Sequence, residues 1–351
     1  MSKFAVLYSE KLKDYDLGHV LTQDRYENFL NLFHKTLGRH SGFTIVVPPH
    51  ATHNELRLIH TQEYIQRIEK CESKDPLDTP LSPSFVRAAK LLAGAGKYAG
   101  ELVCSGEYNK AFVVGGGVQH ASIDQEKGFG VFSDVGICAQ NLMAYYGVKK
   151  IMILDTDAHA GDGIYKIFAE DPRVFYMSLH QDPSTLYPGK GFMDEIGVGS
   201  GEGFSVNVPL PPDTGPEAYE YTLTELFTPL AEEFRPEIIL MVDGSDPHFT
   251  DQITQMGLTI EGIRMVGEIA SDTAHRICAG KLVDFIGSGY SPNQKIVSLG
   301  WLASMAGVTG IEVALEEPVP IPPRKGNRMQ EAKAIVRSLQ SKLSAYWPCF
   351  R

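Results

Sequence analysis

The sequence lacks the features of a disulfide-bonded or membrane-spanning protein. Its five cysteines are an odd number and lie far apart without a CxxC pair, which fits neither a disulfide framework nor a thiolate zinc site. No run of about 18 apolar residues occurs that could span a membrane. The opening MSKFAVLYSEKL contains no apolar stretch of the signal-peptide kind. We therefore expect a cytoplasmic protein without a membrane association.

The sequence also lacks an excess of positive charge. It holds 32 lysine and arginine residues against 43 aspartate and glutamate residues, for a net charge of -11. Proteins that bind the nucleic-acid backbone carry clustered lysine and arginine to displace counterions. The acidic charge balance and the lack of a basic helix therefore argue against a nucleic-acid partner. An acidic surface is compatible with a cationic substrate.

The chain does contain short β-branched runs that alternate with longer helical segments. This alternation is typical of βαβ units and predicts an α/β fold with a mostly parallel sheet. The 351 residues, 43% of them hydrophobic, could form one large domain or two smaller ones. The predicted strands are residues 4–8, 43–47, 112–114, 150–154, 174–179, 238–242 and 283–286. The predicted helices include residues 82–103, 216–232 and 260–277.

One compositional break lies near the C-terminal end. Residues 316–323 are rich in proline and cannot continue a helix, and a helical segment follows from residue 329 to 344. We interpret this segment as a helix that packs back onto the domain, because isolated helices are marginally stable. A free tail is the alternative interpretation.

The loops that follow the predicted strands hold most of the unusual polar residues. Ligands of open parallel sheets bind outside the carboxyl ends of the strands. Chemistry is therefore expected in the loops at residues 115–120, 155–163, 180–191, 243–251 and 287–290.

The strongest of these loops is DTDAHAGDG at residues 155–163. The period-2 alternation of a strand puts Asp155, Asp157 and His159 on one face. Burial of so many polar groups is costly unless a cation organises them, and carboxylate and imidazole suit a borderline divalent metal. Asp246, which follows the apolar run IILMV, is a candidate third ligand of an open catalytic site. The alternative to metal binding is that the side chains of this loop form hydrogen bonds with the following turn, and that Asp246 is a helix N-cap.

Six motifs in order resemble the histone deacetylase and acetylpolyamine amidohydrolase family. They are GGGVQHA at residues 115–121, GFGVFSD at 128–134, DTDAHAGDG at 155–163, SLH with YPGKG at 178–191, GSDPHFTD at 244–251 and GSGY at 287–290. The resemblance extends from residue 15 to residue 307 and includes DLGH at 16–19, HTQEY at 60–64 and DTPLSP at 78–83. It implies a single domain, spanning residues 1–351, with the arginase-deacetylase α/β fold and a central parallel sheet flanked by helices on both faces.

The resemblance implies a metal-dependent deacylase that hydrolyses an acylated amine. The implied metal ligands are Asp157, His159 and Asp246, with Asp155 behind them. One zinc ion per chain is implied, and an Asp-His-Asp set would also accept Fe²⁺ or Co²⁺. A monovalent cation such as K⁺ is implied beside the sheet, at Asp155, Asp157, His159, Ser178 and Leu179.

The resemblance also assigns the acid-base and oxyanion groups. His120 would be the general base toward the attacking water and then the acid toward the leaving amine, oriented by Asp162. Tyr290 would donate a hydrogen bond to the oxyanion in the transition state. The alternative for His120 is a structural histidine, and the alternative for Tyr290 is an ordinary loop aromatic. The glycines on both sides of Ser288 argue against the latter, because they permit close backbone approach before Tyr290.

A narrow tunnel for the stem of the acylated amine is implied as well. Gly128, Phe129 and Tyr187 match its walls, and Arg25 matches an arginine near its floor. Phe129 and Tyr187 could equally be core aromatics. The segment HVLTQDR around Arg25 lacks the prolines common in the family.

Three positions depart from the family pattern. Gln119 stands where the first of two histidines is usual, so one member of the pair is an uncharged amide. Ala160 stands where a second histidine usually follows the metal-binding one, and Ser288 replaces a usual glycine. Gln119 bears on catalysis most directly, and we therefore include it among the catalytic candidates.

Two other functions remain open from the sequence. An arginase-like ureohydrolase would need a second metal, but His248 stands where a dinuclear site wants another aspartate. A non-catalytic binder of acylated lysine or polyamine would keep the site while Gln119 slowed the chemistry. The acyl chain, the identity of the amine, the native metal and the oligomeric state do not follow from the sequence.

Overall fold

The computed structural model describes residues 2–18, 20–322 and 328–351. Two predicted features end beyond this part of the chain, because His19 of the DLGH motif and Pro323 of the proline-rich stretch lie outside the described residues. The strands are β1 (Phe4–Leu7), β2 (Phe43–Val46), β3 (Lys110–Val114), β4 (Ile151–Asp155), β5 (Val174–Gln181), β6 (Ser205–Leu210), β7 (Ile238–Gly244) and β8 (Leu282–Ser288).

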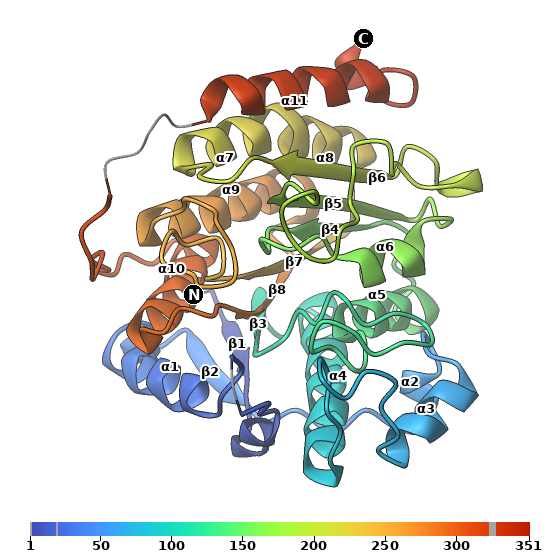
Figure 1. The fold of residues 1–351 in the computed structure, drawn as a ribbon, viewed down its shortest axis with the longest axis vertical. Coiled ribbons are helices and arrows are strands. Elements are labelled where there is room, and N and C mark those ends of the chain that lie inside the picture. Colours follow the sequence, from blue (N-terminus) through green and yellow to red (C-terminus); the bar gives the residue numbers. More distant parts are fainter. Residues whose placement is uncertain (1, 19, 323–327) are drawn as a thin grey trace.

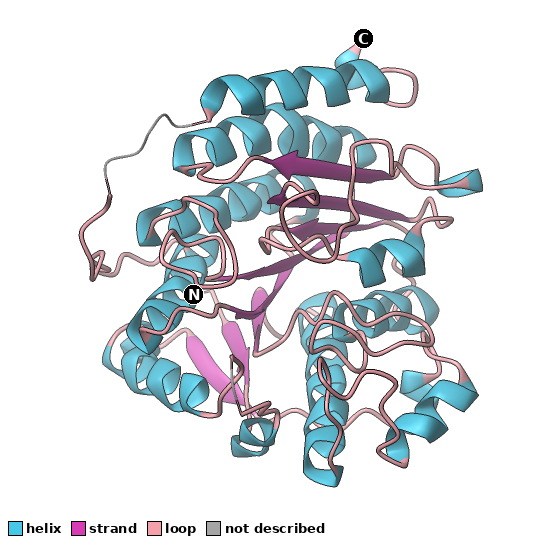
Figure 2. Ribbon diagram, viewed as in Figure 1, coloured by secondary structure: helices cyan, strands magenta, loops and turns pink. Residues whose placement is uncertain are grey.

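These strands form one eight-stranded sheet in the order β2-β1-β3-β8-β7-β4-β5-β6. Each neighbouring pair of described strands is parallel. The prediction of an α/β fold with a mostly parallel central sheet is therefore confirmed. The sheet crosses the middle of the molecule with helices on both of its faces (Figures 1 and 2).

The helices form two layers. They are α1 (Asp24–Lys35), α2 (His53–Leu56), α3 (Gln62–Glu69), α4 (Pro83–Cys104), α5 (Asp134–Tyr145), α6 (Asp162–Phe168), α7 (Pro216–Thr222), α8 (Thr228–Phe234), α9 (Ile260–Cys278), α10 (Gln294–Thr309) and α11 (Met329–Leu343). One layer contains α4, α5 and α6, and the other contains α1, α10, α9, α7 and α8 (Figure 1). Among the described residues, no helix is both long and apolar enough to cross a membrane.

The strand β6 was not predicted, and its composition explains why. It contains Asn207 and Pro209, which are depleted in strands, and proline is confined to positions where no ladder hydrogen bond is needed. β6 lies at the end of the sheet, beside β5 alone. An edge position tolerates Pro209, whereas a central position would not.

The helix predicted over residues 216–232 is wrong in one respect, because it is not a continuous α-helix. A π-helical turn, Leu223–Phe227, separates α7 from α8. Pro229 has no N–H, so the carbonyl of Glu225 lacks its ordinary partner four residues on. The side-chain amide of Gln340 on α11 donates to that carbonyl at 3.0 Å.

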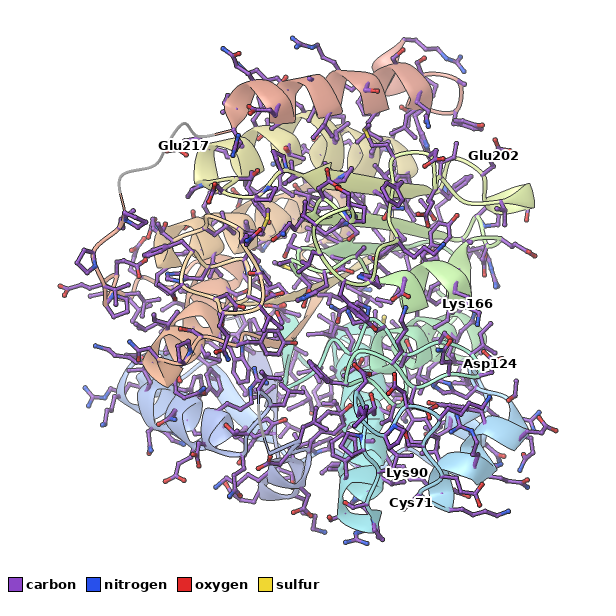
Figure 3. All side chains as sticks on the ribbon, in the orientation of Figure 1. Cys71, Lys90, Asp124, Lys166, Glu202 and Glu217 are labelled. Carbon is purple, nitrogen blue, oxygen red and sulfur yellow. The ribbon has the colours of Figure 1, made fainter. Side chains whose placement is uncertain are left out.

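The C-terminal helix α11 packs against α7 and β6. Its buried residues, Ala332, Val336, Leu339 and Leu343, recur at helical spacing on one face. Past its end, Tyr346 donates from its hydroxyl to Glu202 at 2.6 Å, and Glu202 is labelled in Figure 3. The end of the chain is thus tied to the loop that precedes β6.

The bond from Gln340 to the Glu225 carbonyl can be tested by Gln340→Ala. Loss of a partly buried hydrogen bond typically costs about 1 kcal/mol, so the free energy of unfolding should fall by roughly that amount. Urea unfolding of Gln340→Ala and of Ser338→Ala, an exposed position on the same helix, would measure the effect. Equal stability of the two variants would show that this bond contributes nothing.

Candidate metal centre

Three ionisable side chains meet at the ends of two neighbouring strands. Asp157 and His159 follow β4, Asp246 follows β7, and the two strands are hydrogen-bonded neighbours. The His159 Nδ1 atom lies 3.0 Å from Asp157 Oδ1 and 3.2 Å from Asp246 Oδ2. One ligand atom from each residue lies within 4.8 Å of the other two, and all three residues are buried. The structure therefore brings together the three predicted metal ligands.

Burial makes this cluster electrostatically unfavourable without a cation. Burial and then the charge of Asp157 raise the pKa of Asp246 to about 8. Burial alone would lower the pKa of His159, but hydrogen bonds with Asp157 and Asp246 outweigh it and raise that pKa to about 10. The contacts of His159 Nδ1 with both aspartates place the three groups around a position that a divalent cation suits. The donor set, one nitrogen and carboxylate oxygens, fits a borderline divalent metal.

Asp155 supports the cluster from within the sheet. Its Oδ1 accepts the N–H of Asp157 at 3.2 Å, and its Oδ2 accepts the hydroxyl of Tyr176 at 2.8 Å. Burial and then the charge of Asp157 raise the pKa of Asp155 well above its usual range. Tyr176 was not predicted as a site residue, because an aromatic at a buried strand position usually signals only core packing.

The residues of the predicted monovalent-cation site come from β4, β5 and the loop after β4. Asp155 and Ser178 are direct partners in the β4–β5 register, and Leu179 follows Ser178. The Ser178 hydroxyl lies 2.8 Å from His180 Nδ1. The cation site itself stays a prediction.

A histidine and an aspartate face each other beside the cluster. His120, in the loop after β3, has Nδ1 2.7 Å from Asp162 Oδ1, at the start of α6. Because Nδ1 donates to a carboxylate, Nε2 is the ring nitrogen left to take a proton. The ring centroids of His120 and His159 are 6.0 Å apart. The predicted His120–Asp162 pair is thus formed.

Lys127 joins this pair and was missed by the sequence analysis. Its ammonium bonds to the second oxygen of Asp162 and lies 5.2 Å from the ring centroid of Tyr187. Burial opposes the ionised form of Asp162, but hydrogen bonds from His120 and Lys127 hold the pKa of that carboxyl below its usual value. No sequence signal marks Lys127, because its contact with Asp162 spans 35 residues.

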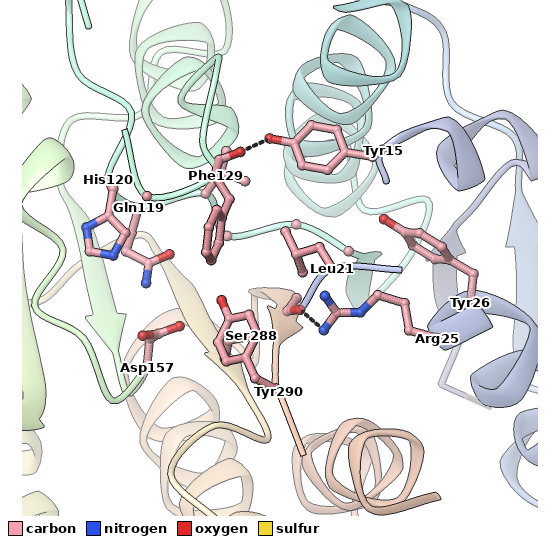
Figure 4. A pocket seen from close by; sticks show the side chains of 16 residues that line it. Tyr15, Leu21, Arg25, Tyr26, Gln119, His120, Phe129, Asp157, Ser288 and Tyr290 are labelled. Atoms are coloured by element: carbon pink, nitrogen blue, oxygen red, sulfur yellow. Dashed lines mark hydrogen bonds between the residues drawn. The ribbon is translucent and has the colours of Figure 1, made fainter. Parts of the chain in front are cut away.

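Gln119 is buried next to His120, at 5% exposure. Its side-chain amide points toward Asp157 in Figure 4. The Gln119 carbonyl accepts the N–H of Ile164 on α6, which fixes the backbone at this position. An uncharged amide therefore lies beside His120 and points toward the metal cluster.

Tyr290 closes another side of the cluster. Its backbone N–H donates to Asp251 Oδ2 at 2.7 Å, and its ring centroid is 6.3 Å from that of His159. Burial, then the charges of Asp157 and Asp246, raise the pKa of Tyr290 well above its usual range. The phenol therefore stays protonated and able to donate.

Phe129 and Tyr187 line a cavity that leads to the cluster. The cavity measures about 190 Å³. Its walls are Asp78, His120, Gly128, Phe129, His159, Leu186, Tyr187, Ile253 and Tyr290. Gly128 and Phe129 have φ of +53° and +66° in a turn that Lys127 and Gly130 close with two backbone hydrogen bonds. A Cβ at Gly128 would lie 2.3 Å from His120 Cδ2, so only glycine fits there.

Arg25 on α1 lies deeper, beside a smaller cavity of about 40 Å³ that Gln119 and Tyr290 also line (Figure 4). Its Nη2 donates to the carbonyls of Gly287 at 2.7 Å and Gly289 at 3.0 Å. Its guanidinium lies 4.9 Å from the Trp301 ring centroid. Arg25 thereby holds the backbone that leads to Tyr290.

The two remaining departures from the family pattern also lie at the site. The Ser288 hydroxyl donates to Asp246 Oδ1, so this residue holds a candidate ligand. Ala160 packs against the backbone at Gly191, where an added Cβ would lie 2.6 Å from Ala160 Cβ and 2.7 Å from His180 Nε2. The role of Ser288 could not be read from the sequence, because its partner is 42 residues away.

Solved structures contain the same fold. The crystal structure of the HDA15 HD domain superposes with a TM-score of 0.86 and covers 100% of this chain and 97% of that one, at 24% identity. The likeness supports the arginase-deacetylase arrangement of the sheet and helices.

Curated relatives are similar over most of their length. A probable deacetylase of Archaeoglobus fulgidus is 34% identical over 318 residues, 88% of this chain and 87% of the relative. The acetoin utilization protein AcuC of Bacillus subtilis is 31% identical and covers 81% and 76% of the two chains. A histone deacetylase-like amidohydrolase of Pseudomonas aeruginosa is 29% identical, covering 83% and 76%.

The family model of the histone deacetylase domain matches residues 19–308. That range contains the Asp157–His159–Asp246 cluster, the His120–Asp162 pair and Tyr290. Together with the relatives above, this match shows that the chain belongs to the histone deacetylase family.

Proposed function

We propose that the chain is a metal-dependent deacylase that hydrolyses the amide of an acylated amine. The observation that carries the proposal is the buried cluster of Asp157, His159 and Asp246 at the end of a cavity walled by aromatic side chains. The acid-base group His120 and the hydrogen-bond donor Tyr290 lie beside that cluster, where a reacting carbonyl would be. In this proposal, residues 1–351 act as one catalytic domain.

The three cluster residues would hold one divalent ion, of which zinc is the family's usual choice and Fe²⁺ or Co²⁺ are alternatives. When bound, this ion supplies Lewis acidity that polarises the amide carbonyl and makes water more acidic. Asp155 and Ser288 orient the ligands through the hydrogen bonds described above. K⁺ at the Asp155–Ser178 site would stabilise the same strand ends.

His120 performs the proton transfers in this proposal. Its Nε2 takes a proton from the attacking water and returns it to the amine nitrogen as the C–N bond breaks. Asp162 accepts the hydrogen bond from Nδ1, which fixes the tautomer and stabilises the imidazolium between the two transfers. A single imidazole is sufficient for this cycle.

Tyr290 donates its phenol proton in a hydrogen bond to the carbonyl oxygen as that oxygen gains negative charge. The raised pKa supports this role, since the phenol does not ionise beside two carboxylates. The contact is stronger in the tetrahedral transition state than in the planar amide, and it therefore accelerates the reaction.

The cavity between Phe129 and Tyr187 fits the aliphatic stem of an acylated lysine or polyamine. Gln119 favours a second candidate, a non-catalytic binder of the same ligands, because an amide cannot change charge where the family has a histidine. A dinuclear ureohydrolase is not supported. His248 bonds to Glu317 at 3.0 Å, and among the described residues only the Asp157, His159 and Asp246 group has metal-ligand geometry.

Metal content gives the first test. One divalent ion per chain should bind, and a chelator should abolish turnover. Asp246→Ala should lose both metal and turnover, because it leaves two protein ligands. Elemental analysis and an acetyl-lysine reporter assay would measure both, with Asp272→Ala on the exposed face of α9 as a control. Two tightly held transition-metal ions per chain would instead favour the dinuclear hydrolase.

Tyr290→Phe tests the oxyanion contact. Removal of one such donor typically costs about 10²- to 10³-fold in rate, roughly 2.7 to 4 kcal/mol. We expect kcat to fall by that factor while KM and metal content stay close to wild type. Tyr145→Phe, which removes an exposed hydroxyl on α5, is the matched control. Unchanged turnover in Tyr290→Phe would remove this residue from the mechanism.

His120→Ala and Gln119→His separate an enzyme from a binder. His120→Ala should lose about 10²-fold or more in kcat, the usual range for a positioned acid-base group. Gln119→His should raise turnover, because it restores a group that can carry positive charge beside Asp157. Steady-state kinetics on a panel of acyl amines, with the exposed His34→Ala as control, would decide. A parent that binds an acyl amine tightly but turns over none would establish the non-catalytic function.

A further inference from the structure

The segment between α10 and α11 contacts the loop that holds the candidate metal ligand Asp246. We call residues 311–322 the strap. The strap lies beyond residue 308, where the match to the family model ends. One of its side chains, Glu317, is only 15% exposed although it stands in an irregular, proline-rich segment. A charged side chain this buried requires partners, and those partners lie at the site.

The carboxylate of Glu317 binds two elements at once. Its Oε1 and Oε2 lie 3.0 and 3.2 Å from His248 Nε2, and its Oε2 also accepts the N–H of Ile260 at 3.1 Å. Ile260 is the first residue of α9, whose opening N–H groups have no partner within the helix. The carboxylate therefore joins the start of a 19-residue helix to the loop that contains Asp246.

The hydrogen bonds of His248 determine which of its ring nitrogens bears the hydrogen. The N–H of Thr250 donates to Nδ1 at 3.2 Å, so Nδ1 is the acceptor and Nε2 bears the hydrogen. Nε2 then donates to Glu317. The Thr250 hydroxyl lies 2.9 Å from Nδ1 and 3.2 Å from the hydroxyl of Ser291, so it can donate to the ring and accept from Ser291.

This chain of bonds reaches both sides of the candidate centre. His248 lies two residues after Asp246, and Ser291 directly follows Tyr290. The same two loops are joined a second time by the bond from the Tyr290 N–H to Asp251. With Glu317 in place, the loop that supplies a metal ligand and the loop that supplies the oxyanion donor are held in one arrangement.

We infer that Glu317 is a positioning residue, and that the strap fixes Asp246 and Tyr290 relative to each other through His248, Thr250 and Ser291. The inference rests on the proposed function for its catalytic consequence. Its structural part, the arrangement of the two loops and their affinity for a divalent ion, does not depend on turnover. Glu317 contacts neither the ion nor the substrate and acts through His248.

The test uses Glu317→Ala in the full chain, with Glu316→Ala as the matched control, because Glu316 is an exposed neighbour in the same strap. Loss of a side chain that bonds directly to a metal ligand typically costs about 10- to 100-fold in metal affinity or activity, and Glu317 acts one contact further out, through His248. We expect Glu317→Ala to weaken Co²⁺ affinity, read from visible absorption, by about 10-fold, the lower end of that range. Amide hydrogen exchange at residues 245–251 and 289–291 should accelerate. On an acetyl-lysine reporter, kcat should fall with little change in KM.

Two further variants keep the test decisive if Glu317→Ala folds poorly. Glu317→Gln keeps an acceptor for His248 Nε2 and should restore most of the Co²⁺ affinity. Thr250→Val removes the hydroxyl between His248 and Ser291 without touching α9, and should accelerate exchange at 289–291. Wild-type Co²⁺ affinity and exchange in Glu317→Ala, or lowered thermal stability alone, would overturn the inference. A wild-type protein that binds Co²⁺ but has no turnover would contradict the proposed function, and affinity and exchange would still decide the role of Glu317.

Discussion

The placement of two carboxylates and an imidazole in a buried position is the constraint on which the site depends. Asp157, His159 and Asp246 lie at the ends of β4 and β7, where burial removes nearly all of the water that would solvate their charges. Unpaired buried charges of this kind cost several kcal/mol each, so they persist only with a counter-charge or a shared proton. The parallel sheet makes the cluster possible, because its strands end at the same edge. Asp155 and Ser288 add hydrogen bonds that hold these carboxylates in fixed orientations.

The acid-base side of the site differs from a two-histidine arrangement in its charge. Gln119 contributes no titratable group, and Lys127 brings a positive charge to Asp162, the partner of His120. A carboxylate that is shared between an ammonium and an imidazole stabilises the imidazolium less than a carboxylate devoted to the imidazole. Gln119 and Lys127 thus change the charge around His120 without adding a second acid-base group. In the proposed deacylase, a more electrophilic acyl group would need less acid-base assistance than a simple acetamide.

The sequence identified those parts of the molecule that obey local rules. The seven predicted strands have strong β-branched runs, and the loops after them contain the three residues of the cluster. The strand β6 escaped notice because Pro209 is tolerated only at an edge, which is a property of the whole sheet. The helix α10 is buried nearly all round, so it has no amphipathic period to detect. The roles of Lys127 and Ser288 could not be foreseen, since each acts through a partner far along the chain.

Glu317 shows why the extent of a family domain need not be the extent of its working unit. Family motifs mark residues whose chemistry is shared, whereas the orientation of a loop depends on whatever packs against it. Here His248 belongs to the loop around Asp246, and a buried histidine with one ring nitrogen engaged by Thr250 needs an acceptor for the other. The 69-residue separation hides that acceptor from local sequence patterns, and the fold supplies it from the strap. The strap is therefore a structural part of the candidate site although it lies outside the matched domain.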